Sequence, residues 1–322
     1  MLDDNGLCEI HKNLGEDYLG VVCKQFPRYS EYYGTIKESG IGLACEEAAR
    51  IILSENRPFS METAACDEEY EPSSEYDSSF ALQIFAAREA VFKILAKESL
   101  SIHEKLIVIL DMGSKIQQCI NTDEYDNIKS VVNDYLKEGI AHTLDETRNL
   151  SDSGQFEDIS LQQGIRQILY PYEEMEVLNP EWEVILKDII DSLFEQMSDE
   201  EYNILNEEFG TYMVSRAYEY RQLLEYLVFR YFAKSIYHYD FLGKCQMLVT
   251  NFFVIRQMDI IRWLDNHREY SFKDRMDVVH IFSRQVEYSE DNIENLYEDF
   301  IFDDIFKTDS LIAILWIDSE NI

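Results

Sequence analysis

Much of the chain consists of long stretches in which apolar residues recur every three or four positions. Polar residues fill the positions between them, which is the pattern of helices that bury one face. The pattern predicts helices over residues 212–237, 241–267 and 272–286, followed by a strongly acidic helical stretch over residues 287–304. We therefore predict an all-α fold, an irregular multi-helix bundle.

Three serines mark predicted helix starts. Each stands three residues before an acidic side chain, which is the spacing of a capping box that satisfies backbone N–H groups at a helix N-terminus. The pairs are Ser101 with Glu104, Ser198 with Glu201, and Ser271 with Asp274. We predict breaks over residues 145–160, where Ser, Asp and Gly interrupt the periodicity, and between Pro171 and Pro180.

Composition divides the chain into three predicted regions. Residues 1–60 hold three of the six cysteines and form a small cysteine-containing N-terminal region. Residues 61–79 are rich in acidic residues and serine and contain no basic residue, which indicates an acidic linker or loop. Residues 80–322 form the predicted helical domain.

The charge balance excludes one large class of partners. The chain has 63 acidic against 28 basic residues and a formal net charge of -35, so it lacks the basic surface that nucleic acid requires. Its N-terminus resembles no secretory signal, and the apolar run at residues 311–317 is too short to cross a bilayer. We expect a cytoplasmic protein with no nucleic-acid or membrane partner.

Cys8, Cys23 and Cys45 are candidate metal ligands. Thiolates are soft ligands that suit zinc and iron–sulfur clusters, and such sites draw them from loops that converge. Their spacing matches no compact C-x-x-C knuckle, however, and an isolated cysteine is often a small buried apolar residue. From the residues alone, both interpretations stay open.

Segments at both ends of the chain resemble the flagellin lysine-N-methylase family. They are DNGLCEIHKNLGEDYL at residues 4–19, Cys23 with FPR at 26–28, LACEEAARIIL at 43–53, LVFRYF at 227–232, VIR at 254–256, RWL at 262–264 and FSRQVEYS at 282–289. The resemblance implies a methyltransferase that moves a methyl group from S-adenosylmethionine to lysine side chains of flagellin. It also implies an iron–sulfur cluster, with zinc as the alternative, held by cysteines that here would include Cys8, Cys23 and Cys45.

The N-terminus departs from the pattern of that family. There, further cysteines, including a paired Cys-Cys, precede the GLC segment, whereas this chain begins only seven residues before Cys8. We therefore expect the chain to be truncated at its N-terminus. The three cysteines would then be an incomplete ligand set.

Residues 218–241 contain nine aromatic side chains, and between Val214 and Cys245 five basic residues outnumber three acidic ones. Tyr226, Arg230, Lys234 and His238 are spaced four apart, so they would lie along one helical face. On the methylase interpretation, Arg230 would hold the carboxylate of S-adenosylmethionine, with Tyr226 and Lys234 beside it and aromatic rings against the adenine or the sulfonium. The alternative is a helix whose cations pair with nearby carboxylates.

Methyl transfer requires a neutral, desolvated lysine amine in line with the methyl–sulfonium bond, so positioning supplies most of the rate. Tyr231, Tyr237 and Asp240 are the candidate catalytic residues, which would orient the amine and receive its proton. Because no G-x-G-x-x-G follows a predicted strand, the cofactor site is expected between helices. Two function classes remain: an S-adenosylmethionine-dependent lysine N-methyltransferase, and a non-catalytic helical binding or scaffold protein derived from that family.

Overall fold

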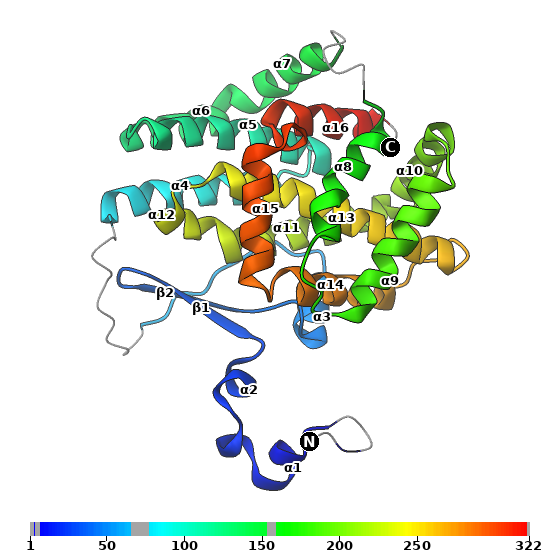
Figure 1. Cartoon of the computed structure of the whole chain (residues 1–322). Coiled ribbons are helices and arrows are strands. Elements are labelled where there is room, and N and C mark those ends of the chain that lie inside the picture. The colour runs from blue at the N-terminus through cyan, green and yellow to red at the C-terminus, as the bar shows by residue number, and fades with distance from the viewer. Residues whose placement is uncertain (1–2, 4–6, 66–76, 153–158, 321–322) are drawn as a thin grey trace.

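The structure, a computed structural model, describes residue 3 and residues 7–65, 77–152 and 159–320. Most of these residues form helices that surround one long helix, α13, Leu242–Asp265 (Figure 1). This helix is buried along nearly its whole length, between α5, α9, α11 and α14. A helix that is enclosed on all sides must be stabilised by its neighbours. The predicted all-α bundle is confirmed.

The other helices of this body follow one another with short connections. They are α4 Ser78–Leu95, α5 Ile102–Asn121, α6 Ile128–Asp134, α7 Ile140–Asp152, α8 Leu161–Glu173, α9 Pro180–Ile189, α10 Asp199–Met213, α11 Ala217–Tyr231, α12 Ser235–His238, α14 Phe272–Val286, α15 Glu290–Phe302 and α16 Thr308–Glu320. Among the described helices, none is both long enough and apolar enough to span a bilayer.

All three predicted capping boxes are present. They open α5, α10 and α14, and in each the serine hydroxyl accepts from the backbone N–H three residues on, while the acidic side chain accepts from the serine N–H. Helix α14 has the predicted limits, and α15 lies within the predicted acidic stretch.

Three predicted boundaries were wrong. The predicted helix over residues 212–237 is interrupted twice, by a 3₁₀ turn at Val214–Arg216 and another at Phe232–Lys234. A 3₁₀ turn keeps nearly the same apolar spacing as an α-helix, so periodicity does not reveal it. Helix α7 continues to Asp152, into the predicted break at residues 145–160, of which residues 153–158 lie outside the described part. Pro171 lies inside α8, so the next break begins only after Glu173.

The N-terminal region contains a β-hairpin that the sequence pattern did not predict. Strands β1, Arg28–Tyr33, and β2, Ile36–Ile41, pair antiparallel, with Tyr33 opposite Ile36. A two-residue turn joins them, and its Gly34 has a φ of 59°, which glycine adopts without strain.

The remaining N-terminal elements differ in how they meet the body. Helices α1, Glu9–Leu14, and α2, Val21–Gln25, contain no buried residue and extend away from the helical body (Figure 1). Helix α3, Glu46–Leu53, packs against α11 and α14. Residues 66–76 of the predicted linker lie outside the described residues, and the division into three regions stays a prediction.

Candidate cofactor site beside helix α11

Arg230, in the last turn of α11, lies between the hairpin and the end of α14. Its Nη1 donates a hydrogen bond to the Tyr226 hydroxyl at 2.7 Å, and its Nε lies 3.8 Å from Glu287 Oε1. The guanidinium lies 4.6 Å from the ring centroid of Tyr29 in β1 and 5.7 Å from that of Tyr288. A guanidinium paired with a carboxylate and stacked on aromatic rings is held in one position.

Glu287 is the acceptor at the centre of this cluster. Its carboxylate accepts hydrogen bonds from the hydroxyls of Tyr226 at 3.1 Å and Tyr231 at 3.3 Å, and also from the Ser283 hydroxyl. The Glu287 side chain is 1% exposed and that of Arg230 is 12% exposed. A carboxylate this deeply buried needs such partners to offset its lost hydration. The cluster therefore ties α11 to α14.

The electrostatics fix the protonation of these groups. Burial, reinforced by the charge of Glu287, raises the pKa of Tyr226 and of Tyr231 well above its ordinary value. Burial opposes the charge on Arg230, but Glu287 and the surrounding tyrosines outweigh it and raise the pKa of Arg230. Tyr226 and Tyr231 are thus hydrogen-bond donors near neutral pH, and neither is poised to act as a base.

A cavity of about 280 Å³ opens next to this cluster, between α11, the hairpin and the segment that follows α3. Its aromatic walls are formed by Tyr29, Phe59, Tyr226 and Phe229. A larger cavity of about 650 Å³ runs along the hairpin and shares Phe59 and Phe229 with the first. Together the two cavities reach the size of an ordinary small-molecule site of roughly 300–1,000 Å³.

Glu225 gives the smaller cavity a carboxylate. Burial raises the pKa of Glu225, although the neighbouring Arg221 and Lys105 act in the opposite direction. Its Oε1 also accepts a hydrogen bond from Arg221 Nη1 at 2.7 Å. A carboxylate with a raised pKa is a stronger base than an ordinary one.

The structure separates the other predicted site residues from these cavities. Lys234 forms an ion pair with Glu31 of β1 at 2.7 Å. The Tyr237 hydroxyl donates to the main-chain oxygen of Tyr32 at 2.9 Å. Asp240 accepts from the N–H of Gly243 at 2.8 Å, at the start of α13.

The predicted binding face is therefore not one continuous surface. Tyr226 and Arg230 lie on α11, whereas Lys234 belongs to the 3₁₀ turn after it and His238 to α12. Arg230 and Lys234 both pair with carboxylates, as the alternative interpretation of this segment expected. The assignment of Tyr226, Arg230 and Lys234 to cofactor binding, and of Tyr231, Tyr237 and Asp240 to catalysis, stays a prediction.

The three N-terminal cysteines are not assembled into a metal site. Cys8 precedes α1, the exposed Cys23 lies in α2, and Cys45 immediately precedes α3. Within the described residues, no group of three or more His, Cys, Asp and Glu side chains is placed to hold a metal ion. The residues described here do not fit an iron–sulfur cluster or zinc, and no step below is routed through a metal.

The sequence pattern missed Glu287, Tyr29 and Glu225. One signal for Glu287 was available, because Ser283 stands four residues before it at the end of a predicted helix. Nothing local connects Tyr29 to Arg230, since the hairpin reaches α11 only through the fold. Glu225 lies on the same helix as Arg230, but only the fold shows that it lines the cavity.

Comparison with known proteins agrees with the resemblance in the sequence. The family model of the FliB lysine N-methylase C-terminal domain matches residues 88–314, which include Arg230, Glu287 and the helices around them. No curated protein and no solved structure matches the chain. The match covers well over half of the sequence, and it confirms the predicted family. The chain belongs to the FliB lysine N-methylase family, through the C-terminal domain of that family.

Proposed function

We propose that the protein is a lysine N-methyltransferase that transfers a methyl group from S-adenosylmethionine to lysine side chains of flagellin. The observation that carries this proposal is the family match over residues 88–314. The cavities beside α11 support it, because they combine aromatic walls with the buried carboxylate of Glu225, which lies with Tyr226 and Phe229 in the matched region.

In this proposal the cofactor lies in the joined cavities beside α11. Tyr29, Phe59 and Phe229 would pack against its adenine. Arg230 lies behind Tyr29 and Tyr226, so its direct contact with the methionine carboxylate would require giving up part of its pairing with Glu287. Its role in the proposal is to hold both tyrosine rings in position.

S-Adenosylmethionine, when bound, would supply an electrophilic methyl group. The protein would have to hold the lysine amine neutral and aligned, which burial in an apolar cavity favours because it lowers the pKa of an amine. Among the residues that line the two cavities, Glu225 is the buried carboxylate whose pKa is raised, and it is our proposed acceptor for the amine proton.

Isothermal titration with S-adenosylmethionine, paired with a labelled-methyl transfer assay on flagellin, tests the proposal. We expect saturable binding that Phe229→Ala weakens by about tenfold or more, because a buried aromatic contact is lost. The matched control is Phe302→Ala, since Phe302 is 78% exposed and lies on α15. Glu225→Gln should keep binding and lower transfer by about 10² or more.

Three results would contradict the proposal in different ways. A folded protein that binds no S-adenosylmethionine would exclude the cofactor. Binding without transfer to any lysine would favour the non-catalytic alternative. Binding that Phe229→Ala and Phe302→Ala leave equally intact would keep the activity but remove the site from α11.

A further inference from the structure

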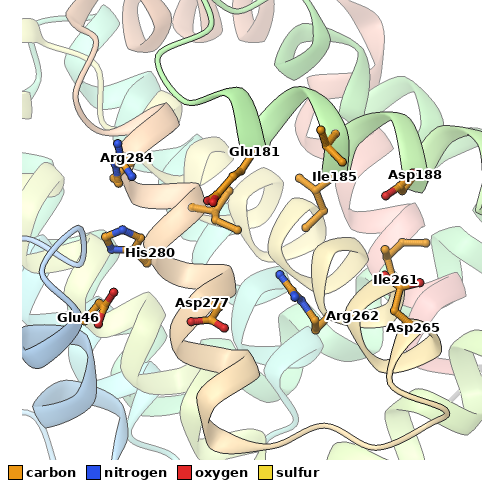
Figure 2. Close-up of a pocket in the computed structure, with 12 residues that line it drawn as sticks. Glu46, Glu181, Ile185, Asp188, Ile261, Arg262, Asp265, Asp277, His280 and Arg284 are labelled. Atoms are coloured by element: carbon orange, nitrogen blue, oxygen red, sulfur yellow. The ribbon is translucent and has the colours of Figure 1, made fainter. Parts of the chain in front are cut away.

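A second cleft, of about 660 Å³, lies between α9, the end of α13 and α14 (Figure 2). Helix α9 contributes Glu181, Ile185 and Asp188, which the helical repeat places on one face. The end of α13 and the outer face of α14 complete the walls, and Glu46 at the start of α3 lies at the rim. The cleft is partly open to solvent.

Two arginines in this cleft are unlike every other arginine in the described residues. Within the described residues, the side chains of Arg262 and Arg284 make no hydrogen bond, ion pair or ring contact, and Arg262 acts on the carboxylate of Asp274 only electrostatically. Each of the other arginines has at least one such partner. In a chain with 63 acidic and 28 basic residues, a cation finds a partner easily. Two unpaired guanidiniums in one cleft therefore leave a cluster of donors available to a ligand.

A third donor or acceptor position in the cleft is also unused. His280, which lies between Arg284 and Asp277 along α14 in Figure 2, has a buried Nδ1 without a hydrogen-bond partner. Buried polar atoms are normally satisfied, so an unsatisfied one in a residue that lines the cleft is a position with which a ligand could pair. The Arg262 side chain also extends into the space between α9 and α14 (Figure 2).

The carboxylates of the cleft are available as well. Glu181, Asp188 and Asp265 form no side-chain hydrogen bond and no ion pair within the described residues, and Asp277 is bonded to Lys273 at the surface. The lining carries five carboxylates against two arginines, so its field favours a cationic ligand. Ile185, Ile261 and Ile281 supply an apolar surface between the charges.

We propose that this cleft docks a short extended segment of a protein substrate that carries lysine side chains. The main-chain carbonyls of the segment would accept hydrogen bonds from Arg262, Arg284 and His280. The lysine ammonium groups would pair with Glu181, Asp188 and Asp265, while the lysine stems pack on the isoleucines. The cleft, of about 660 Å³ and partly open to solvent, can admit a short peptide segment.

This inference rests on the proposed function, because it supplies the protein segment that a lysine methyltransferase must hold. Fluorescence anisotropy with a labelled peptide of ten residues containing three lysines tests it without requiring methyl transfer. The comparison peptide carries glutamines in place of the lysines. We expect the double variant Glu181→Gln with Asp188→Asn to weaken binding of the lysine peptide about tenfold, because two charge-assisted contacts are lost.

The matched control removes the same charge elsewhere, through Glu294→Gln with Glu298→Gln on exposed turns of α15. It should leave the affinity within about twofold, since these exposed charges are screened. Arg262→Gln provides the sharpest test. Simple charge attraction predicts that losing a cation tightens binding of a cationic peptide, whereas docking through carbonyls predicts a weakening of about fivefold.

Four outcomes would overturn the docking site: no saturable binding to the folded protein, equal affinity for the lysine and glutamine peptides, equal losses in the cleft and control variants, or tighter binding by Arg262→Gln. Peptide binding of the expected pattern without methyl transfer would contradict the proposed activity alone. Transfer to flagellin that is unaffected by the cleft variants, together with no cleft-dependent peptide binding, would contradict the docking site alone.

Discussion

The α11 cluster and the α14 cleft use arginine in opposite ways. Arg230 has its charge offset by Glu287 and its faces covered by tyrosine rings, and it is 12% exposed. Within the part of the chain that the structure describes, the side chains of Arg262 and Arg284 form no ion pair and no ring contact, although carboxylates line the same cleft. A charge whose partners are already in place stabilises the fold, whereas a charge without partners remains able to bind something else.

The largest expected difference between the two regions is in stability. Glu287→Ala should lower the free energy of unfolding by about 3–5 kcal/mol, because it leaves Arg230 buried without its carboxylate. Urea unfolding followed by circular dichroism measures this change. Glu89→Ala is the control, since its ion pair with Lys93 is exposed and should contribute at most about 1 kcal/mol. If both variants lost the same free energy of unfolding, the buried Arg230–Glu287 pair would contribute no more to stability than the exposed Lys93–Glu89 pair.

Lys244 tests an intermediate case, a buried cation with incomplete pairing. Its Nζ lies 3.8 Å from Asp240 and 3.5 Å from the ring centroid of Tyr297, and burial lowers the pKa of Lys244 to about 8. Between pH 8 and 10.5 the unfolded chain therefore binds more protons at this residue than the folded protein does. The contribution of Lys244 to the free energy of unfolding should therefore increase between pH 8 and 10.5, by up to about 1.4 kcal/mol per pH unit.

Urea unfolding at pH 7.5 and 9.5 measures this change in the wild type and in Lys244→Met. The free energy of unfolding of Lys244→Met should not show the increase that Lys244 causes. The control is Lys93→Met at an exposed position, which should still show the increase in the free energy of unfolding. If the wild type and Lys244→Met change stability in parallel with pH, Lys244 is charged in the folded state throughout this range and the burial argument fails.

The smallest expected effect concerns the unpaired arginines themselves. Arg284→Ala should change the free energy of unfolding by less than about 0.5 kcal/mol, because its exposed side chain makes no pair to lose. The same urea titration measures it, with Arg230→Ala as the contrasting variant. A loss as large as that of Arg230→Ala would mean that Arg284 has a structural role, and the comparison between the two regions would no longer hold.

Helix positions were predictable where the information is local. Ser271 and Asp274 set the start of α14, and the apolar period set its end at Val286. The hairpin was missed because its strands are largely polar on both faces, as in the RYSEYY sequence of β1, so no apolar alternation marks it. Tyr226 and Arg230 were predicted to share a helical face because they stand four residues apart, and both lie on α11.

The remaining site geometry depends on contacts between distant segments. Tyr29 lies far before Arg230 in the sequence and Glu287 far after it. No pattern in either segment indicates that its side chain contacts Arg230. The cleft beside α14 likewise needs three helices to be packed before its residues face one another. Sequence reasoning identified residue types and helical faces, and the fold decided which of them meet.

Because α13 is enclosed by other helices, its backbone amides should be among the last to exchange with solvent. Its backbone amides are shielded by helices on every side, so exposing them to heavy water requires most of the body to come apart. The amides of α1 and α2, which contain no buried residue, need no such event. Deuterium uptake should therefore begin in the N-terminal arm and reach α13 last.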